Sequence, residues 1–245
     1  MPEGYRKRGE GQMIKLFCLP YAGGSSTIFS GWKRFLDASV ELVALELPGH
    51  GTRMSEPLLN RAESVTEDLF MQAKSHLGDS DYAIFGHSMG SLLAYELQRK
   101  LTMENKQPIH MFFSGRFPPH IPEKKVLHQL SNSALKQAII EMGGVPEEFS
   151  KNEQVLDFFL PILRADFELL ETYRNTAVAP LSCDISVFYG KRDLPSVLFD
   201  LSDWSQYTDQ TCRFYEFEGD HFFINQKTEE VTAKINHILN QTGVV

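Results

Sequence analysis

The 245-residue sequence lacks any apolar run that approaches the roughly 20 residues needed to cross a bilayer. It has only three cysteines, Cys18, Cys183 and Cys212, and no Cys-x-x-Cys pair, which disfavours a disulfide framework and a zinc site. Positive charge is also scarce: 24 basic residues face 32 acidic ones and the net charge is −8, so nucleic acid is not an expected partner. No segment repeats with a period of about 20 to 50 residues, which excludes solenoids and propellers. These absences leave an ordinary globular protein.

The polar N-terminus predicts a flexible tail over residues 1–12. Its basic run, Arg6-Lys7-Arg8, is followed by Gly9-Glu10-Gly11-Gln12 and not by the apolar stretch of a secretory signal. We therefore expect a cytoplasmic protein that does not bind membranes, and we expect it to be a monomer.

Short apolar runs alternate with helical patterns along the chain. Six β-prone runs are nearly continuous in apolar residues, as strands covered on both faces are: Ile14–Leu19, Val40–Leu45, Tyr82–Phe85, Ile109–Ser114, Ile185–Tyr189 and Arg213–Phe217. Between them, apolar residues recur at helical spacing, at positions 65, 69, 73 and 77, then 93, 97 and 101, and finally 231, 235 and 239. This order predicts an α/β fold, a mainly parallel doubly wound sheet built from residues 13–115 and 181–245. Its active site is expected beyond the carboxyl ends of the strands.

Residues 116–180 interrupt this alternation, because they separate two strands by far more than one crossover helix needs. The segment holds six of the 12 prolines and two helical patterns, at Leu127–Ile140 and Val155–Tyr173. We predict an inserted helical lid over 116–180. The alternative is a small packed subdomain without a role in substrate access.

The most informative motif is Gly86-His87-Ser88-Met89-Gly90, a Gly-x-Ser-x-Gly sequence between a predicted strand and a predicted helix. A serine on such a sharp turn has strained backbone geometry, and glycines two positions away avoid collisions with the neighbouring strand and helix. Ser88 is therefore the candidate nucleophile at the N-terminus of a helix.

A serine nucleophile needs a histidine base and a carboxylate that orients it. His221 follows the last predicted strand and is the candidate base, with His50 as a weaker competitor. Asp193 directly follows the strand Ile185–Tyr189 and is the candidate acid, with Asp220 as its competitor. The chain order Ser88, Asp193, His221 is typical of α/β-hydrolases.

Backbone N–H groups for a developing oxyanion are expected from Ala22, in the loop after the first strand, and from Met89. The same loop, Pro20-Tyr21-Ala22-Gly23-Gly24, has neither of the glycine patterns that hold phosphates. We expect no metal and no bound cofactor.

Six segments together resemble the type II, or editing, thioesterases of nonribosomal peptide and polyketide assembly lines, over about residues 14 to 240. They are Leu16 to Ser25, Pro48-Gly49-His50-Gly51-Thr52-Arg53, Phe85 to Gly90, Ser114-Gly115-Arg116, Leu160 to Phe167, and Gly219-Asp220-His221-Phe222-Phe223. The most specific is the Leu-Arg-Ala-Asp-Phe sequence that ends at Phe167, since many hydrolases share the serine motif and few share this one.

The resemblance implies the α/β-hydrolase fold and an enzyme that removes stalled acyl groups from the phosphopantetheine arms of acyl- or peptidyl-carrier domains. It assigns Ser88 as nucleophile, His221 as base, Asp193 as its acid partner, and the backbones of Ala22 and Met89 to the oxyanion hole. Phosphopantetheine would arrive on the partner.

Two other functions share these features: a carboxylesterase or lipase that acts on small free esters, and a binding module without catalysis. Docking on a carrier would need a local basic patch, and Arg116 and the Lys124-Lys125 pair are expected to be solvated instead.

Overall fold

The computed structural model describes residues 13–143, 151–175, 178–193 and 200–242. The tail predicted over residues 1–12 lies outside this part of the chain. None of the helices in the described ranges is both long enough and apolar enough to cross a membrane.

Six parallel strands form one sheet with the order β2-β1-β3-β4-β5-β6. The strands are β1 (Ile14–Leu19), β2 (Val40–Ala44), β3 (Asp81–His87), β4 (His110–Ser114), β5 (Ile185–Gly190) and β6 (Cys212–Phe217). Each coincides with one of the six predicted runs to within a few residues, so the mainly parallel α/β sheet is confirmed. After β2 the chain returns past β1 to form β3, and ligands of such sheets bind at this change of direction.

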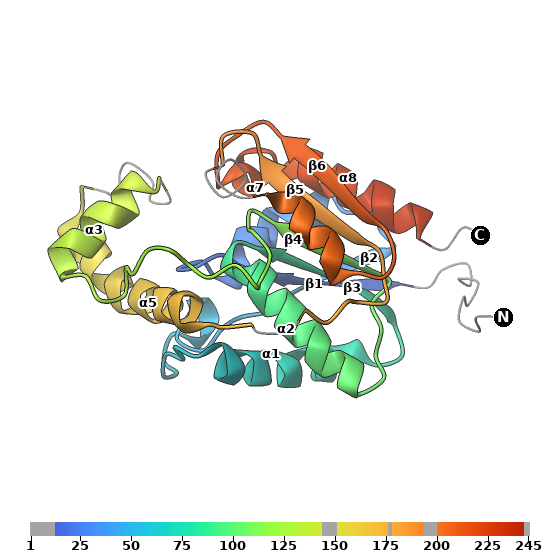
Figure 1. Cartoon of the computed structure of the whole chain (residues 1–245), viewed down its shortest axis with the longest axis horizontal. Coiled ribbons are helices and arrows are strands. Elements are labelled where there is room, and N and C mark those ends of the chain that lie inside the picture. Colours follow the sequence, from blue (N-terminus) through green and yellow to red (C-terminus); the bar gives the residue numbers. More distant parts are fainter. Residues whose placement is uncertain (1–12, 144–150, 176–177, 194–199, 243–245) are drawn as a thin grey trace.

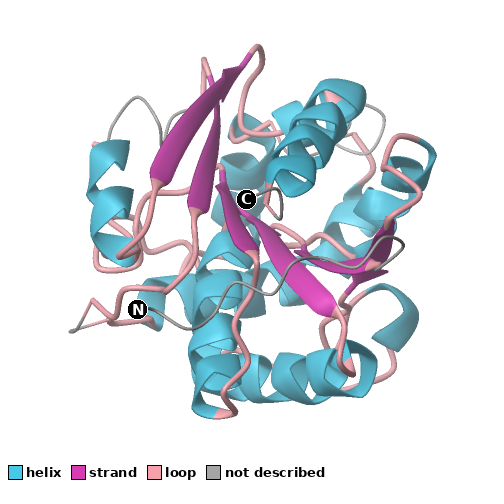
Figure 2. Ribbon diagram, turned by 90° about the vertical axis from the view of Figure 1, so that its right-hand side faces the viewer, coloured by secondary structure: helices cyan, strands magenta, loops and turns pink. Residues whose placement is uncertain are grey.

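Helices cover both faces of the sheet (Figures 1 and 2). The helices α1 (Ala62–Leu77) and α2 (Met89–Met103) pack on one face, and the 3-10 helix η1 (Ser26–Arg34) and α8 (Thr228–Gln241) pack on the other. Short elements complete the layers: η2 (Gly51–Arg53), η3 (Leu201–Tyr207) and α7 (Phe223–Gln226). The predicted stripes at 65 to 77 and 231 to 239 are buried, and each large apolar side chain removed from water contributes about 1.5 to 3 kcal/mol.

Between β4 and β5 the described chain forms two helices, α3 (Asn132–Glu141) and α5 (Glu153–Thr172), which lie together beyond one end of the sheet (Figure 1). The helix predicted to begin at Leu127 begins five residues later. In the segment before it, the carboxylate of Glu171 in α5 accepts hydrogen bonds from the backbone N–H groups of Leu127 (2.6 Å) and His128 (3.1 Å). The helix begins after Ser131, whose side chain accepts a hydrogen bond from the N–H of Ala134 and caps α3.

Candidate active site

Ser88 lies on the tight turn between β3 and α2 with φ 55° and ψ −116°, a conformation that few residues other than glycine adopt. Two glycines make this turn possible. A Cβ atom at Gly86 would lie 2.1 Å from the carbonyl oxygen of Gly90, and one at Gly90 would lie 2.2 Å from that of Leu19. The turn therefore requires both glycines of the Gly-x-Ser-x-Gly motif.

Asp193 and His221 follow the neighbouring strands β5 and β6, whose carboxyl ends meet at the same edge of the sheet. Nδ1 of His221 lies 3.0 Å from Oδ1 of Asp193, which is fully buried. The competitor Asp220 is directed elsewhere, since its carboxylate accepts hydrogen bonds from the backbone of Phe222 and the amide of Gln226. Of the two aspartates, Asp193 is the one that the structure places against the imidazole.

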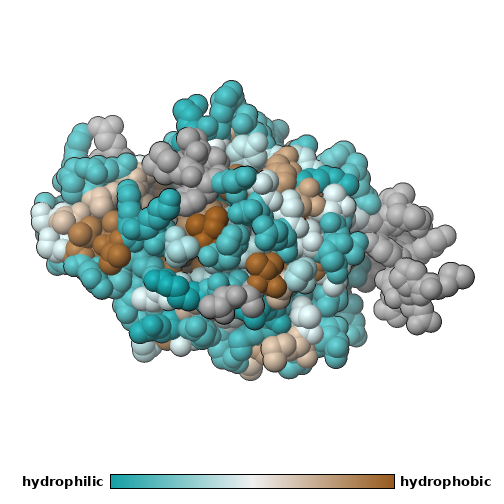
Figure 3. Space-filling view, in the orientation of Figure 1, coloured by the Kyte–Doolittle hydropathy of each residue, from teal (hydrophilic) through white to brown (hydrophobic). Residues whose placement is uncertain are grey.

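A cavity of about 710 Å³ opens at this edge, and Ser88, Asp193, His221 and Ala22 all line it. Its far wall is apolar and comes from α3 and α5, with contributions from Ile139, Leu156, Phe159, Leu160, Leu163 and Leu170. These two helices also expose apolar side chains, including Phe158 and Ile140, and Figure 3 shows brown surface at the end of the molecule where they lie. The geometry places a nucleophile and a paired histidine beside a space suited to an apolar chain.

Met89, the other predicted oxyanion donor, is the first residue of α2, so its N–H is one of the helix donors without an intrahelical acceptor. The loop that carries Ala22 is held on both sides of that residue. The N–H of Gly24 donates to the carbonyl of Tyr21 (2.9 Å), and the N–H of Gly23 donates to Oδ2 of Asp166 in α5 (2.7 Å).

His87 has a positioning contact that the sequence did not reveal. Its Nε2–H donates to the backbone carbonyl of His221 (2.8 Å), which leaves Nδ1 to accept from the hydroxyl of Ser114 (2.8 Å). Burial, and then the charge of His221, hold the pKa of His87 well below its usual value, so the ring is neutral. The residue next to Ser88 therefore anchors the backbone of the candidate base.

His50, the weaker candidate base, is buried and hydrogen-bonded away from Ser88. Its Nε2 lies 3.0 Å from Oδ2 of Asp166, and both side chains are almost inaccessible. Asp166 belongs to the Leu-Arg-Ala-Asp-Phe sequence, the most specific of the segments that resemble type II thioesterases. The sequence alone does not indicate what this aspartate contacts.

Arg116 corrects a second expectation, because it is buried and not solvated. It follows β4, lines the cavity, and pairs with Glu123 at 2.9 Å. Lys125 is exposed at the same cavity. Among the residues described, no three His, Cys, Asp or Glu side chains are grouped so that they could hold a metal ion.

Comparison with protein families decides the class of this site. A family model described as "Thioesterase domain" matches residues 14–239. The chain belongs to this thioesterase family. It is accordingly a thioester hydrolase, as the sequence motifs predicted.

The sequence similarity to other proteins covers almost the whole of this thioesterase. The chain is 32% identical to "Linear gramicidin dehydrogenase LgrE" of Brevibacillus parabrevis, over 92% of this chain and 88% of the relative. It is 31% identical to "Thioesterase PikA5" of Streptomyces venezuelae, over 94% and 83%. The crystal structure of "ClbQ from the colibactin NRPS/PKS pathway" superposes with a TM-score of 0.89 at 33% identity, covering 94% of this chain and 98% of that one.

These relatives confirm the predicted resemblance to thioesterases of assembly lines. The name of the LgrE relative contains the word dehydrogenase, which denotes a redox activity. The loop after β1 of this thioesterase, however, lacks the Gly-x-Gly-x-x-Gly pattern typical of dinucleotide binding.

Proposed function

We propose that this thioesterase hydrolyses acyl thioesters on the phosphopantetheine arms of carrier domains in nonribosomal peptide or polyketide synthesis. The observation that carries the proposal is the apolar cavity lined by Ser88 and by the His221–Asp193 pair, in a chain of the thioesterase family. The biosynthetic setting is supported by relatives such as ClbQ, whose pathway combines both kinds of synthesis.

In the proposed mechanism, His221 accepts the hydroxyl proton as Ser88 Oγ attacks the thioester carbonyl. The N–H groups of Ala22 and Met89 bind the resulting oxyanion, and each such donor contributes about 10²- to 10³-fold in rate. The C–S bond then breaks, and the pantetheine thiolate takes the proton from His221. Asp193 holds the imidazole in the tautomer that this transfer needs.

The acyl-enzyme is released by water. His221 takes a proton from the water as its oxygen attacks the acyl carbonyl, and returns that proton to Ser88 when the carboxylic acid leaves. In the complete reaction, one thioester and one water molecule give one carboxylic acid and one thiol. The residues present therefore suffice for the chemistry without a bound cofactor. Phosphopantetheine arrives on the acyl- or peptidyl-carrier partner, and the enzyme acts as a cytoplasmic monomer.

We propose further that residues 116–180 form a lid on the hydrolase core of residues 13–115 and 181–245. Support comes from α3 and α5, which supply the apolar wall of the cavity. The acyl chain would lie against this wall while its carbonyl carbon faces Ser88.

Hydrolysis of a purified acyl-carrier protein tests the function, with Ser88→Ala as the variant. We expect a loss of several decades in kcat, because members of a triad act as a unit. Ser75→Ala is the matched control, since it makes the same change on the exposed surface of α1 and should keep wild-type turnover. Equal turnover by Ser88→Ala and wild type would overturn the mechanism.

The alternative function, a carboxylesterase or lipase, is separated by the substrate. An enzyme for carriers should hydrolyse the acyl-carrier thioester with a higher kcat/KM than a free ester of the same acyl group, whereas an esterase should show the opposite order. A binding module without catalysis would leave Ser88 unlabelled by a fluorophosphonate probe.

A further inference from the structure

We propose that the buried pair His50 and Asp166 is a positioning element that fixes the oxyanion loop, residues 20–26, by holding the backbone N–H of Gly23. This inference rests on the proposed function, because it concerns the loop to which the oxyanion donor Ala22 is assigned. Neither side chain touches the reacting atoms, and both act through the loop.

One carboxylate oxygen joins three parts of the fold. Oδ2 of Asp166, on α5, accepts the N–H of Gly23 at 2.7 Å and lies 3.0 Å from Nε2 of His50. His50 belongs to the turn after β2, and Gly23 to the loop after β1. The contact therefore connects the inserted segment with two loops of the sheet, across 143 and 116 positions of the chain.

The geometry places a proton between the two side chains. Nδ1 of His50 lies 3.0 Å from the carbonyl of Pro48, which can only accept, so Nδ1 carries a proton and Nε2 faces the carboxylate. Burial lowers the pKa of His50, but the hydrogen bond and charge of Asp166, together with the Pro48 carbonyl and the charge of Glu46, raise the pKa overall. A hydrogen bond from Gly23 to an ionised carboxylate is about twice as strong as one to a neutral acceptor.

A second contact from the same helix face holds Gly23 in place. Gly23 has φ +74°, and a Cβ atom there would lie 2.6 Å from Cδ2 of Leu163. Leu163 and Asp166 are three positions apart on α5, so they lie on one face. Leu163 packs against Gly23 while Asp166 binds its N–H, and the peptide is fixed both sterically and by a hydrogen bond.

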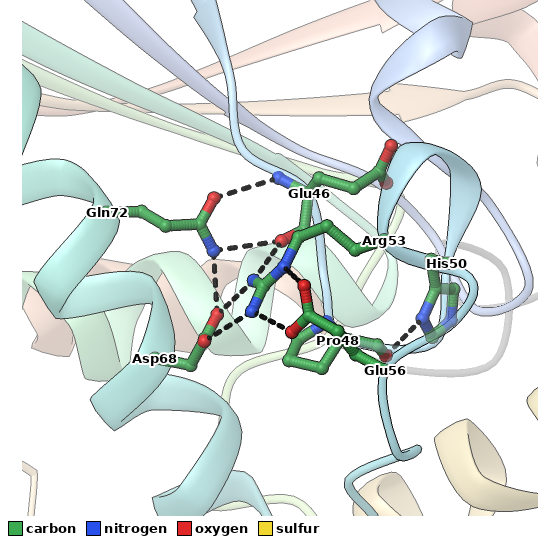
Figure 4. A network of polar contacts seen from close by, with 7 residues as sticks. All are labelled: Glu46, Pro48, His50, Arg53, Glu56, Asp68 and Gln72. Carbon is green, nitrogen blue, oxygen red and sulfur yellow. Dashed lines mark hydrogen bonds and ion pairs between the residues drawn. The ribbon is translucent and has the colours of Figure 1, made fainter.

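The turn that carries His50 is itself anchored firmly (Figure 4). Arg53 donates to the backbone carbonyl of Glu46 (3.0 Å) and to both carboxylate oxygens of Asp68 (2.6 and 2.8 Å). The buried carboxylate of Glu46 also accepts the N–H (3.0 Å) and the hydroxyl (2.7 Å) of Ser26. The oxyanion loop is thus tied at two points. Ser26 binds Glu46 directly, and Gly23 binds Asp166 of α5, which His50 contacts from the turn after β2.

Fixing these two points matters for rate because Ala22 immediately precedes Gly23. Its N–H must lie near the position that the oxyanion will occupy, and a displacement of about 1 Å can cost about 10²-fold. Loss of the Asp166 contact would release the peptide beside the donor without changing the donor itself. The expected signature is a lower kcat with little change in KM.

The test compares four variants of the whole enzyme: Asp166→Ala, Asp166→Asn, His50→Gln and Tyr82→Phe. Asn can keep an oxygen for Gly23 by turning its nitrogen toward the site of Oδ1, which has no hydrogen-bond partner in the described part of the protein. Gln at position 50 keeps an N–H donor but removes the titratable ring. Tyr82→Phe is the control, because it removes a buried hydrogen bond to Gln98 (2.9 Å) at the opposite end of β3.

Two readouts are measured on samples calibrated by the amount of Ser88 that a fluorophosphonate labels at completion. The first is kcat and KM for an acyl-carrier protein, and the second is the rate constant of fluorophosphonate labelling. We expect Asp166→Ala to lower kcat per active site by about 30- to 100-fold, with KM within about threefold, and to slow labelling similarly. Asp166→Asn and His50→Gln should fall between Ala and wild type, and Tyr82→Phe should stay within about threefold of wild type in both readouts.

Wild-type kcat per active site in Asp166→Ala, with only a lower melting temperature, would overturn the proposal. If that variant does not fold, Asp166→Asn and His50→Gln decide, and wild-type rate constants in both would overturn it as well. Failure of the proposed function can be distinguished from failure of this proposal about the loop. In that case wild type would not hydrolyse acyl-carrier proteins, whereas the labelling rates would still report on the loop without any carrier.

Discussion

Adding one methyl group at Gly86 should disable the enzyme while leaving the nucleophile intact. The Cβ of an alanine would lie 2.1 Å from the carbonyl oxygen of Gly90, 2.4 Å from its carbonyl carbon and 2.6 Å from the nitrogen of Ser91. All three atoms are backbone at the start of α2, so no side chain can rotate away.

The size of the effect follows from the distance that must be recovered. Ordinary van der Waals contact begins near 3.4 Å, so the strand and the helix must separate by about 1.3 Å. That movement carries Ser88 and Met89 away from His221. Since a misplacement of about 1 Å can cost about 10²-fold, we expect kcat to fall at least about 100-fold, or about 2.7 kcal/mol of barrier. Overpacking should also lower the free energy of unfolding by about 1 to 3 kcal/mol.

The assay is turnover of an acyl-carrier protein, accompanied by urea unfolding. Gly31→Ala is the matched control, because the nearest atom that its Cβ would meet is the end of the Arg34 side chain at 3.5 Å, an ordinary contact. It should keep wild-type kcat. If Gly86→Ala matched Gly31→Ala in both kcat and stability, the reasoning about the turn would be wrong.

Three further predictions concern histidines and their partners. Asp193→Asn should lower kcat by about 10⁴-fold, because it favours the wrong tautomer of His221, and should leave the far-UV circular dichroism unchanged. A loss below tenfold in steady-state kcat would contradict this role. His87→Phe removes the donor to the His221 carbonyl and should lower kcat by about 10- to 100-fold. His87→Gln can keep a donor there and should lose less activity. Equal kcat values for the two variants would argue against an anchoring hydrogen bond. Burial lowers the pKa of His110 to about 4, while the charge of Asp184 raises this pKa and that of Arg213 lowers it. Between about pH 6.5 and pH 4 the unfolded chain therefore binds the proton more readily, and the free energy of unfolding falls by up to about 1.4 kcal/mol per pH unit as the pH drops. Urea titrations between pH 6.5 and 5 should therefore show a shallower dependence in His110→Gln, and an unchanged slope would refute the assignment.

The sheet could be predicted because each strand is a short apolar run bounded by turn residues, and parallel strands buried on both faces leave that pattern locally. The candidate residues Ser88, Asp193 and His221 could be predicted for a related reason. Each directly follows a predicted strand, and the carboxyl ends of parallel strands meet at one edge.

The features that sequence analysis missed depend on contacts between distant parts of the chain. Glu171 binds the chain ahead of α3 through hydrogen bonds to residues 44 and 43 positions earlier, and no local pattern indicates such a partner. Arg116 was expected in solvent because arginine usually is, but Glu123 pairs with it in the wall of the cavity. His50 and Asp166 each look unremarkable locally, and only the fold brings them to the same backbone N–H.

The origin of the cavity walls has a consequence for how acyl preference can change. The catalytic candidates are set by the sheet, while most of the surface that would hold the acyl chain comes from one continuous stretch between β4 and β5. Transplanting that stretch from a relative could therefore retune chain-length selectivity and leave the chemistry alone. The graft would have to retain Leu163 and Asp166, because those two side chains reach out of the exchanged piece and hold a loop of the recipient.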